Sequence, residues 1–385
     1  MPLGIINCKL RDYRDHFRIT LYKEFRDNLR INSSSIILLK VNGNEFIRIP
    51  IKRDFHITIP KRFINKNQSN IDLEILKIWS IEQAIKRSTK LFCNEKVNLS
   101  SLVPLKTIFG KDIFVLDEED YMYIWYSTGG GADYIKIKKE TSLEKIAELI
   151  GFYFGDGNTS ANVRSFRLNN CEQSVLNYCL DILEDIGIRR DMVKVQVIYS
   201  TPYEKIGNSI KERCTSYWSE ILGLKESQIV SINRSFGKTE SLQYGSARIF
   251  LDNATFVELM LNGVLKRFIK FLKNPNSKEK RVILRGFLRG LAAAEGSVIL
   301  TSLKSLSKVG FAYNPHSEDL DFYKLMLTNL GVNYAGINGN ELYIYRMSNF
   351  KIFNDIDLFK MHETRKIKFN LGYQNHKFYN KSNIN

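Results

Sequence analysis

Two acidic residues stand at the ends of two similar apolar segments. The stretch LIGFYFGDG (149–157) ends on Asp156 and a glycine, and LRGLAAAEG (288–296) ends on Glu295 and a glycine, 139 residues later. A carboxylate at a helix C-terminus adds to the partial negative charge already there and costs a few tenths to about 1 kcal/mol. A divalent cation would reverse this cost, because carboxylate oxygens are ligands that suit Mg²⁺. The paired acids therefore indicate a metal site rather than two ordinary helix ends.

Small residues at matched positions predict how two helices bring these acids together. Gly151 and Gly155 in the first segment correspond to Gly290 and Ala294 in the second. Residues four apart lie on one face of a helix, and small side chains there let two backbones approach closely. We expect these four residues to form a helix interface from which the two acids emerge side by side.

The order of elements that follows each helix also repeats. The first helix is followed by a strand pattern over 163–170 and a helix pattern over 176–188; the second is followed by a strand pattern over 308–314 and a helix pattern over 320–332. A last pair, 247–260 and 342–355, reads as a strand, a cap at Asn253 or Ser348, and an amphipathic helix. We predict an α+β fold of two pseudo-symmetric αββαββα repeats. The shorter offset of the last pair places an insertion at about 199–244.

These patterns divide the chain into three predicted parts. They are an N-terminal β-rich accessory domain (1–140), a first repeat (141–279), and a second repeat with a basic C-terminal tail (280–385). Asn-Gly between apolar runs in 36–51 predicts a hairpin in the first part. A run of three glycines at 129–131 indicates a linker, with the boundary near 128–141. The N-terminal part is either a further binding module or a support for the first repeat.

The two segments resemble the signature of the LAGLIDADG homing endonucleases in their single-chain, two-repeat form. The nine-letter signature maps onto Leu149–Gly157 and Leu288–Gly296, and the resemblance covers roughly 142–375. The first copy departs from it with Phe-Tyr-Phe where the signature has Leu-Ile-Asp. The resemblance implies saddle-shaped antiparallel sheets along the DNA major groove, with the signature helices at the domain interface.

The same resemblance implies a reaction and its cofactor. It implies Mg²⁺-dependent hydrolysis of both strands of a long, asymmetric double-stranded target, which leaves short 3′ overhangs. Two or three divalent ions would be held by Asp156 and Glu295 with the backbone carbonyls of Gly155 and Ala294. Since no His or Cys lies in either signature, a metal-bound water is the expected nucleophile.

Basic and polar residues outside the signatures supply the remaining candidates. We expect Lys366, in HETRKIKFN, and its counterpart Lys266, in LKRFIKFLKN, to lie beside the acids as catalytic groups. Reading bases in the major groove requires donors and acceptors on strands. The candidates for this role are Arg164, Arg167, Asn169, Lys194, Gln196, Tyr343, Tyr345 and Arg346.

Composition narrows the class of partner. The 385 residues carry 57 Lys and Arg against 41 Asp and Glu, a net charge of +16, which favours nucleic acid over a membrane surface. No apolar run of about 18 residues is present, and the five cysteines lack zinc-site or disulfide spacing. We therefore expect an intracellular protein, cytoplasmic and associated with the nucleoid, or in the organelle matrix if it is organellar. We expect a monomer.

Three functions remain open at this point. The first is a site-specific double-strand DNA endonuclease that acts in intron homing. The second is a cleavage-deficient binding protein on the same scaffold, either an intron maturase that binds RNA or a transcriptional regulator. The third is a structural RNA- or ribosome-binding protein, which would leave the paired acids and paired small residues unexplained.

Overall fold

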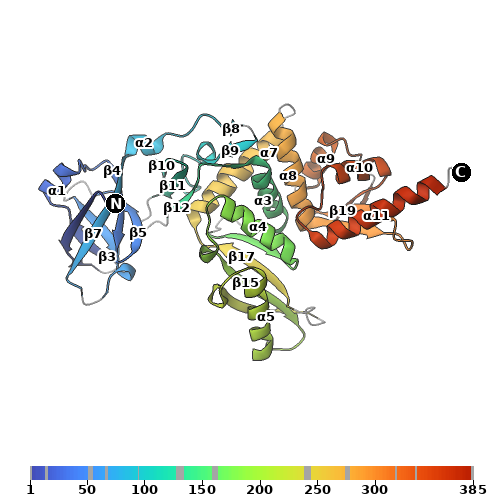
Figure 1. Ribbon diagram of the computed structural model, residues 1–385, viewed down its shortest axis with the longest axis horizontal. Helices are drawn as coiled ribbons and strands as arrows, with labels where there is room; N and C mark the ends of the chain where they lie inside the picture. Colours follow the sequence, from blue (N-terminus) through green and yellow to red (C-terminus); the bar gives the residue numbers. More distant parts are fainter. Residues whose placement is uncertain are drawn as a thin grey trace. The chain divides into compact units, whose positions relative to one another are not determined.

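The computed structural model describes residues 2–13, 16–50, 55–65, 68–93, 95–126, 134–157, 164–237, 244–273, 278–316, 319–333 and 336–382 (Figure 1). The chain forms two compact units. Unit 1 comprises Met1–Leu91, Asn98–Lys139 and Asn253–Gly263, and unit 2 comprises Phe92–Val97, Glu140–Asp252 and Val264–Asn385. The chain passes from unit 1 to unit 2 at Lys139–Glu140, beside the expected boundary. Two short segments depart from this division: Phe92–Val97 belongs to unit 2, and Asn253–Gly263 belongs to unit 1. The glycine run at 129–131 lies outside the described residues.

Unit 1 is rich in β-structure. Its sheets are β1-β7-β4-β5, β2-β3-β6 and β10-β11-β12. Their strands are β1 (Gly4–Lys9), β2 (Arg11–Asp12), β3 (His16–Thr20), β4 (Ser35–Val41), β5 (Asn44–Arg48), β6 (His56–Pro60), β7 (Asn70–Ser80), β10 (Ile113–Glu118), β11 (Tyr121–Tyr126) and β12 (Ile135–Lys138). Short helices α1 (Lys23–Asn28), η1 (Lys61–Phe63), α2 (Ile81–Ile85) and η2 (Leu99–Leu102) connect them. The predicted hairpin is confirmed: β4 pairs with β5 across Asn42 and Gly43, both at positive φ.

Unit 2 contains the two repeats. The first has α3 (Leu143–Asp156), β14 (Phe166–Asn170), α4 (Gln173–Asp185), η3 (Arg190–Met192), β15 (Lys194–Thr201), α5 (Asn208–Ile221), η4 (Glu226–Gln228), β16 (Ile229–Phe236) and β17 (Ser246–Leu251). The second has α8 (Lys278–Glu295), β18 (Gly296–Leu300), β19 (Leu306–Ala312), α9 (Asp319–Asn329), β20 (Gly336–Asn338), β21 (Glu341–Ile344), α10 (Met347–Asp355) and α11 (Glu363–Ser382). A small sheet, β13-β9-β8, contains β8 (Phe92–Cys93), β9 (Lys96–Asn98) and β13 (Glu140–Ser142).

The sheets of the two repeats share one topology, which confirms the predicted α+β fold. The order β14-β17-β15 in the first repeat corresponds to β19-β21-β20 in the second. In the first repeat, the position that corresponds to β18 forms one antiparallel bridge, between Gly157 and Leu168. This bridge matches the pairing of Gly296 with Phe311 in the second repeat. The predicted insertion supplies α5 and β16. Because β16 pairs parallel to β15, the first sheet is mixed rather than wholly antiparallel.

Of the two predicted helix caps, the one at Asn253 is confirmed and the one at Ser348 is not. The Asn253 side chain accepts a hydrogen bond from the Phe256 N–H at 2.9 Å and caps α6 (Ala254–Val257), as expected. The chain then continues through a π-helix, η5 (Glu258–Leu265), into α7 (Lys266–Lys273). The predicted cap at Ser348 is wrong, because α10 already begins at Met347, after Arg346 with φ of 75°. The neighbouring Asn349 side chain instead donates to the Tyr345 carbonyl at 2.6 Å.

None of the helices in the described part of the chain is both long enough and apolar enough to cross a membrane.

Candidate nucleic-acid interface and acid pair

Helices α3 and α8 pack along their whole small-residue faces (Figure 1). A Cβ atom added to Gly151 would lie 2.1 Å from the Phe287 carbonyl oxygen, and one added to Gly290 would lie 2.0 Å from the Glu148 carbonyl oxygen. These distances are far below van der Waals contact, so the two backbones touch directly. Sequence reasoning overlooked Gly286, where a Cβ would lie 2.6 Å from the Glu144 carbonyl oxygen. Its spacing of four residues from Gly290 could have identified it.

The close packing brings the two predicted acids together at the ends of the helices. Asp156 is the last residue of α3 and Glu295 the last residue of α8. The Cγ of Glu295 lies 3.0 Å from the Cβ position of Gly155, so the glycine leaves room for that side chain. Each glycine that follows an acid sits under the preceding turn: a Cβ on Gly157 would lie 2.3 Å from the Tyr153 carbonyl oxygen. Gly157 has an extended backbone, so contact rather than left-handed φ requires glycine there.

Burial makes both carboxylates weaker acids than in water. It raises the pKa of Asp156 to about 6, against a 3.3 Å hydrogen bond from the Asn170 amide and the charge of Arg365. The pKa of Glu295 rises to about 7, mainly through burial and further through the Asp156 carboxylate, with Arg365 opposing. The pair is therefore poised to take up protons or a cation near neutral pH.

An arginine that the sequence reasoning did not select lies beside the acids. One guanidinium nitrogen of Arg365, on α11, donates to the carbonyls of Ala292 at 2.7 Å, Ala293 at 2.8 Å and Ala294 at 3.4 Å. It thus neutralises the C-terminal end of α8, where carbonyl oxygens lack partners within the helix. Residues 365, 369 and 373 recur at four-residue spacing, and Phe369 and Tyr373 are buried. That helical periodicity was the available signal.

A histidine holds the start of α11 in place. The Nδ1 of His362 accepts a hydrogen bond from the Arg365 backbone N–H at 3.3 Å. Burial and the Arg365 charge lower the pKa of His362 to about 4. The ring is consequently neutral at pH 7 and keeps the lone pair that this hydrogen bond needs.

The two lysines predicted as catalytic groups differ in their contacts: Lys366 is paired with a carboxylate, and Lys266 is exposed. The Lys366 amine forms an ion pair with Asp357 at 2.8 Å. Lys266 is exposed at the first position of α7. Lys273, seven residues further along the same helix face and roughly 10 Å along its axis, lines a cavity next to Phe154.

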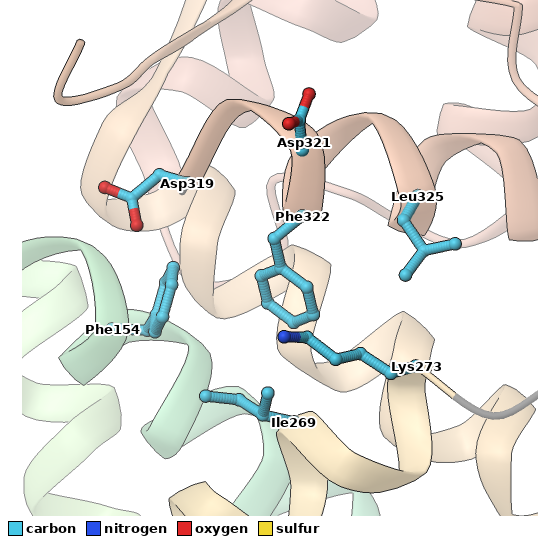
Figure 2. Close-up of a pocket in the computed structure, with 7 residues that line it drawn as sticks. All are labelled: Phe154, Ile269, Lys273, Asp319, Asp321, Phe322 and Leu325. Carbon is cyan, nitrogen blue, oxygen red and sulfur yellow. The ribbon is translucent and has the colours of Figure 1, made fainter. Parts of the chain in front are cut away.

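This cavity has a volume of about 390 Å³ and lies between α3, α7 and α9. Figure 2 shows Phe154, Phe322, Ile269 and Leu325 around it, with the amine end of Lys273 beside the Phe322 ring. Asp319 also lines the cavity, and its charge contributes to the raised pKa of Glu295. One residue that lines the cavity, Asp319, is therefore close enough to Glu295 to influence its charge.

The chemistry of the acid pair fits a divalent ion. The two carboxylates and the Gly155 carbonyl are hard oxygen donors, and Mg²⁺ commonly retains several water ligands beside one or two carboxylates. The Ala294 carbonyl, the fourth predicted ligand, is 3.4 Å from the Arg365 guanidinium. Across the described residues, no cluster of three or more His, Cys, Asp or Glu side chains with metal-binding geometry is present.

A buried ionic network joins the two repeats below the acids. Glu148 of α3 is fully buried and accepts hydrogen bonds from Arg289 of α8 at 2.9 Å and from Tyr178 of α4 at 2.6 Å. The Lys360 amine lies 3.1 Å from the same carboxylate. Arg289 also donates to Glu144 at 2.6 Å. Several paired charges thus replace water around one buried carboxylate, as such a group requires.

The outward face of the first sheet carries a continuous polar row. In strand register, Asn169 of β14 lies opposite Arg248 of β17, Arg248 lies opposite Gln196 of β15, and Gln196 lies opposite Ser231 of β16. The Arg248 guanidinium donates to the side-chain Oε1 of Gln196 at 3.2 Å, and the Gln196 side-chain Nε2 donates to the Ser231 hydroxyl at 3.2 Å. The alternate residues of β14, β15 and β17 are buried, so the row faces away from the core. Arg248 and Ser231 were not predicted, although Arg248 alternates with buried residues in its strand.

The other predicted readers of the first repeat surround this row. Arg167 and Lys194 both lie opposite Phe250 in the sheet, and the Lys194 amine pairs with Asp252 at 3.2 Å. Arg164 is exposed just before β14. The Oδ1 of Asn169 is buried and has no hydrogen-bond partner within the described part of the chain.

The second sheet presents a different face. The Tyr343 hydroxyl donates to Glu341 at 2.5 Å, and the Lys308 amine lies 3.5 Å from the centre of the Tyr343 ring. Tyr345 and Arg346 lie beyond the end of β21 rather than within it. The structure therefore places Arg167, Asn169, Lys194 and Gln196 on or beside one row. In the second repeat, the rings of Tyr343 and Tyr345 lie against each other, with their centres 6.4 Å apart.

Comparisons with known proteins give no family assignment. No family model matches the sequence, and no curated protein matches it significantly. Among solved structures, the chain is similar to the N-terminal LAGLIDADG domain of DUF199/WhiA, at 14% identity and a TM-score of 0.32, over 57% of this chain and 83% of that one. It is also similar to full-length DUF199/WhiA from Thermatoga maritima, at 15% identity and a TM-score of 0.33, over 60% of this chain and 59% of that one. Likenesses of this size transfer no function.

Proposed function

We propose that this protein binds double-stranded DNA through the outward face of its first sheet and recognises sequence there, on the two-repeat scaffold that its signatures resemble. The polar row Asn169, Arg248, Gln196 and Ser231 is the observation that carries this proposal. Such a row offers charged and amide groups of the kind that bind base edges in the major groove. The net charge of +16 supplies the attraction to phosphates.

The shape of the surface favours DNA over duplex RNA. The major groove of B-form DNA is wide enough to admit two adjacent strands of a sheet, whereas the major groove of A-form RNA is deep and narrow. The inserted strand β16 widens the sheet by one strand and brings Ser231 into the row. Its next outward residue, Asn233, lies opposite Ile198 and is exposed.

Arg248 is the residue to test. It sits in the middle of the row, and a guanidinium commonly contacts guanine. After selection of preferred sites from a randomised duplex library, Arg248→Ala should bind them about 5- to 100-fold more weakly and lose preference at one or two base positions. Binding is measured by titration of labelled duplexes, with a duplex RNA of equal length as comparison.

Arg189→Ala is the matched control, because Arg189 is an exposed arginine of unit 2 that pairs with Asp191 away from the row. It should retain the base preference of the wild type. Selection of no sequence by the wild type, or equal preference in Arg248→Ala, would rule out recognition by this face.

Cleavage of the bound DNA is a second candidate, favoured by the convergence of Asp156 and Glu295. The two acids and the Gly155 carbonyl would hold the ion, which when bound would supply a water of lowered pKa. Residues of the chain would position the ion: Asn170 orients Asp156, and Arg365 balances the charge of the two acids. The test is to incubate the selected duplex with Mg²⁺ and compare the wild type with Asp156→Asn. Cuts that vanish in the variant while binding persists support cleavage; intact DNA with the wild type leaves binding as the function.

A further inference from the structure

Unit 1 carries a loop whose large apolar side chains point into solvent. Over 105–111 the loop exposes Leu105 (62%), Ile108 (49%) and Phe109 (72%). Single exposed apolar residues are common on protein surfaces, but three within five residues form a feature that needs an explanation. Lys106 and Lys111, both exposed, flank the tip.

The loop is held in one conformation by its own hydrogen bonds. An antiparallel bridge between Lys106 and Asp112 closes it, and the buried Thr107 lies inside the turn. The Thr107 hydroxyl accepts from the Lys111 N–H at 3.1 Å, and the Thr107 carbonyl accepts from the Gly110 N–H at 2.9 Å. Gly110, with φ of 79°, permits this tight turn.

A buried carboxylate joins the tip of the loop to Asn253–Gly263, a segment of unit 1 that is distant in sequence. Glu258 is buried and accepts the Ile108 N–H at 3.2 Å, while its second oxygen accepts from the Asn262 amide at 2.6 Å. A Cβ on Gly263 would lie 2.2 Å from the Leu102 carbonyl oxygen, so the backbone before the loop packs on the same segment. The fold therefore orders a loop whose most prominent side chain, Phe109, contributes little to the core.

We propose that this loop is a second DNA contact, in which Ile108 and Phe109 insert between base pairs from the minor groove and the two lysines lie on the flanking phosphates. The inference rests on the proposed function. DNA-bending proteins use apolar wedges of one or two side chains to open a base step. The clamped backbone keeps the wedge ordered before binding, which lowers the entropic cost of insertion. Membrane-bound helices, in contrast, bury a whole apolar face.

Unwinding of a closed circular plasmid tests this insertion without knowledge of a target sequence. A relaxed plasmid is treated with topoisomerase I in the presence of the full chain, and the linking number is read after the protein is removed. The wild type should lower the linking number, and Phe109→Ser should not. Phe109→Ser should also bind a random 30-bp duplex roughly tenfold more weakly, as expected when one stacking contact is lost. Tyr22→Ser is the control, since Tyr22 is 58% exposed on the same unit, and it should behave as the wild type.

The outcomes separate this inference from the proposed function. Equal unwinding by Phe109→Ser and the wild type, or binding of the duplex without unwinding by the wild type, would overturn insertion while leaving recognition by the sheet intact. Absence of any duplex binding by the wild type would refute both proposals. Binding to vesicles of phosphatidylserine and phosphatidylcholine that depends on Phe109, with unchanged unwinding, would assign the loop to a lipid surface instead.

Discussion

At the scale of residues, the acid pair and Arg365 form one charge system. Two carboxylates at helix ends would repel each other, and the guanidinium of Arg365 reduces that repulsion while it caps α8. Burial nevertheless leaves both acids protonatable near neutral pH. The pH dependence of stability should therefore report on the pair.

Glu295→Gln should flatten part of that pH dependence. The unfolded carboxyl ionises near its usual pKa of 4.5, whereas the folded one ionises near 7. Between these values the folded state binds more protons, so the free energy of unfolding of the wild type falls as pH rises through this window. Between pH 4.5 and 8 the wild type should lose about 2 kcal/mol relative to the variant. Urea unfolding in buffers that contain EDTA measures this difference, and parallel pH profiles would contradict it.

Arg289→Leu should destabilise unit 2 strongly. It removes the main cation from the fully buried Glu148, which keeps the Lys360 amine at 3.1 Å. Loss of one partner from a buried ion pair costs about 3–5 kcal/mol. Arg189→Leu, which breaks an exposed pair, should cost less than about 1 kcal/mol. Chemical unfolding of the two variants compares them directly, and similar losses would show that the buried network contributes little.

At the scale of elements, the contact between α3 and α8 joins the two repeats. Glycines at 151, 286 and 290 bring the backbones into direct contact, and this fixes the relative rotation of the helices. The rotation places the acids at one end. Each sheet follows its helix, so the pair also orients the polar row.

Gly151→Ala tests the importance of this contact. The added methyl group would lie 2.1 Å from the Phe287 carbonyl oxygen, so the helices must separate. Overpacking of this kind costs about 1–3 kcal/mol. Gly207→Ala is the control, because nothing lies within 4 Å of its Cβ position and its φ is ordinary. Thermal unfolding compares the two, and a Gly151→Ala protein as stable as the control would mean that the helices are not in backbone contact.

At the scale of the whole molecule, local sequence patterns predicted the elements better than their partners. The helix interface followed from four-residue spacing, and the sheet faces followed from alternation. The parallel pairing of β16 could not be predicted, since nothing in IVSINRSF specifies the direction of its neighbour. The assignment of Asn253–Gly263 to unit 1 depends on contacts such as that between Glu258 and Ile108, 150 residues apart.

In the candidate site, too, some residues could be predicted from the sequence and others depended on contacts in the fold. Asp156 and Glu295 were found because their type and position repeat. Arg365 was missed in favour of Lys366, because sequence alone did not show which of two adjacent cations turns toward α8 and which pairs with Asp357. Arg248 was missed because its strand was read only as a core element of the repeat.

The most direct test of DNA recognition by the first sheet is photo-cross-linking from its outward face. A photoreactive amino acid at Ile198, which lies between Ser246 and Asn233 on that face, is irradiated with a random 30-bp duplex. The same group at Tyr203, which is 66% exposed and outside the sheet, is the control. We expect cross-links to DNA from position 198 and few from position 203. Cross-links from position 203 with none from position 198 would contradict binding through this sheet.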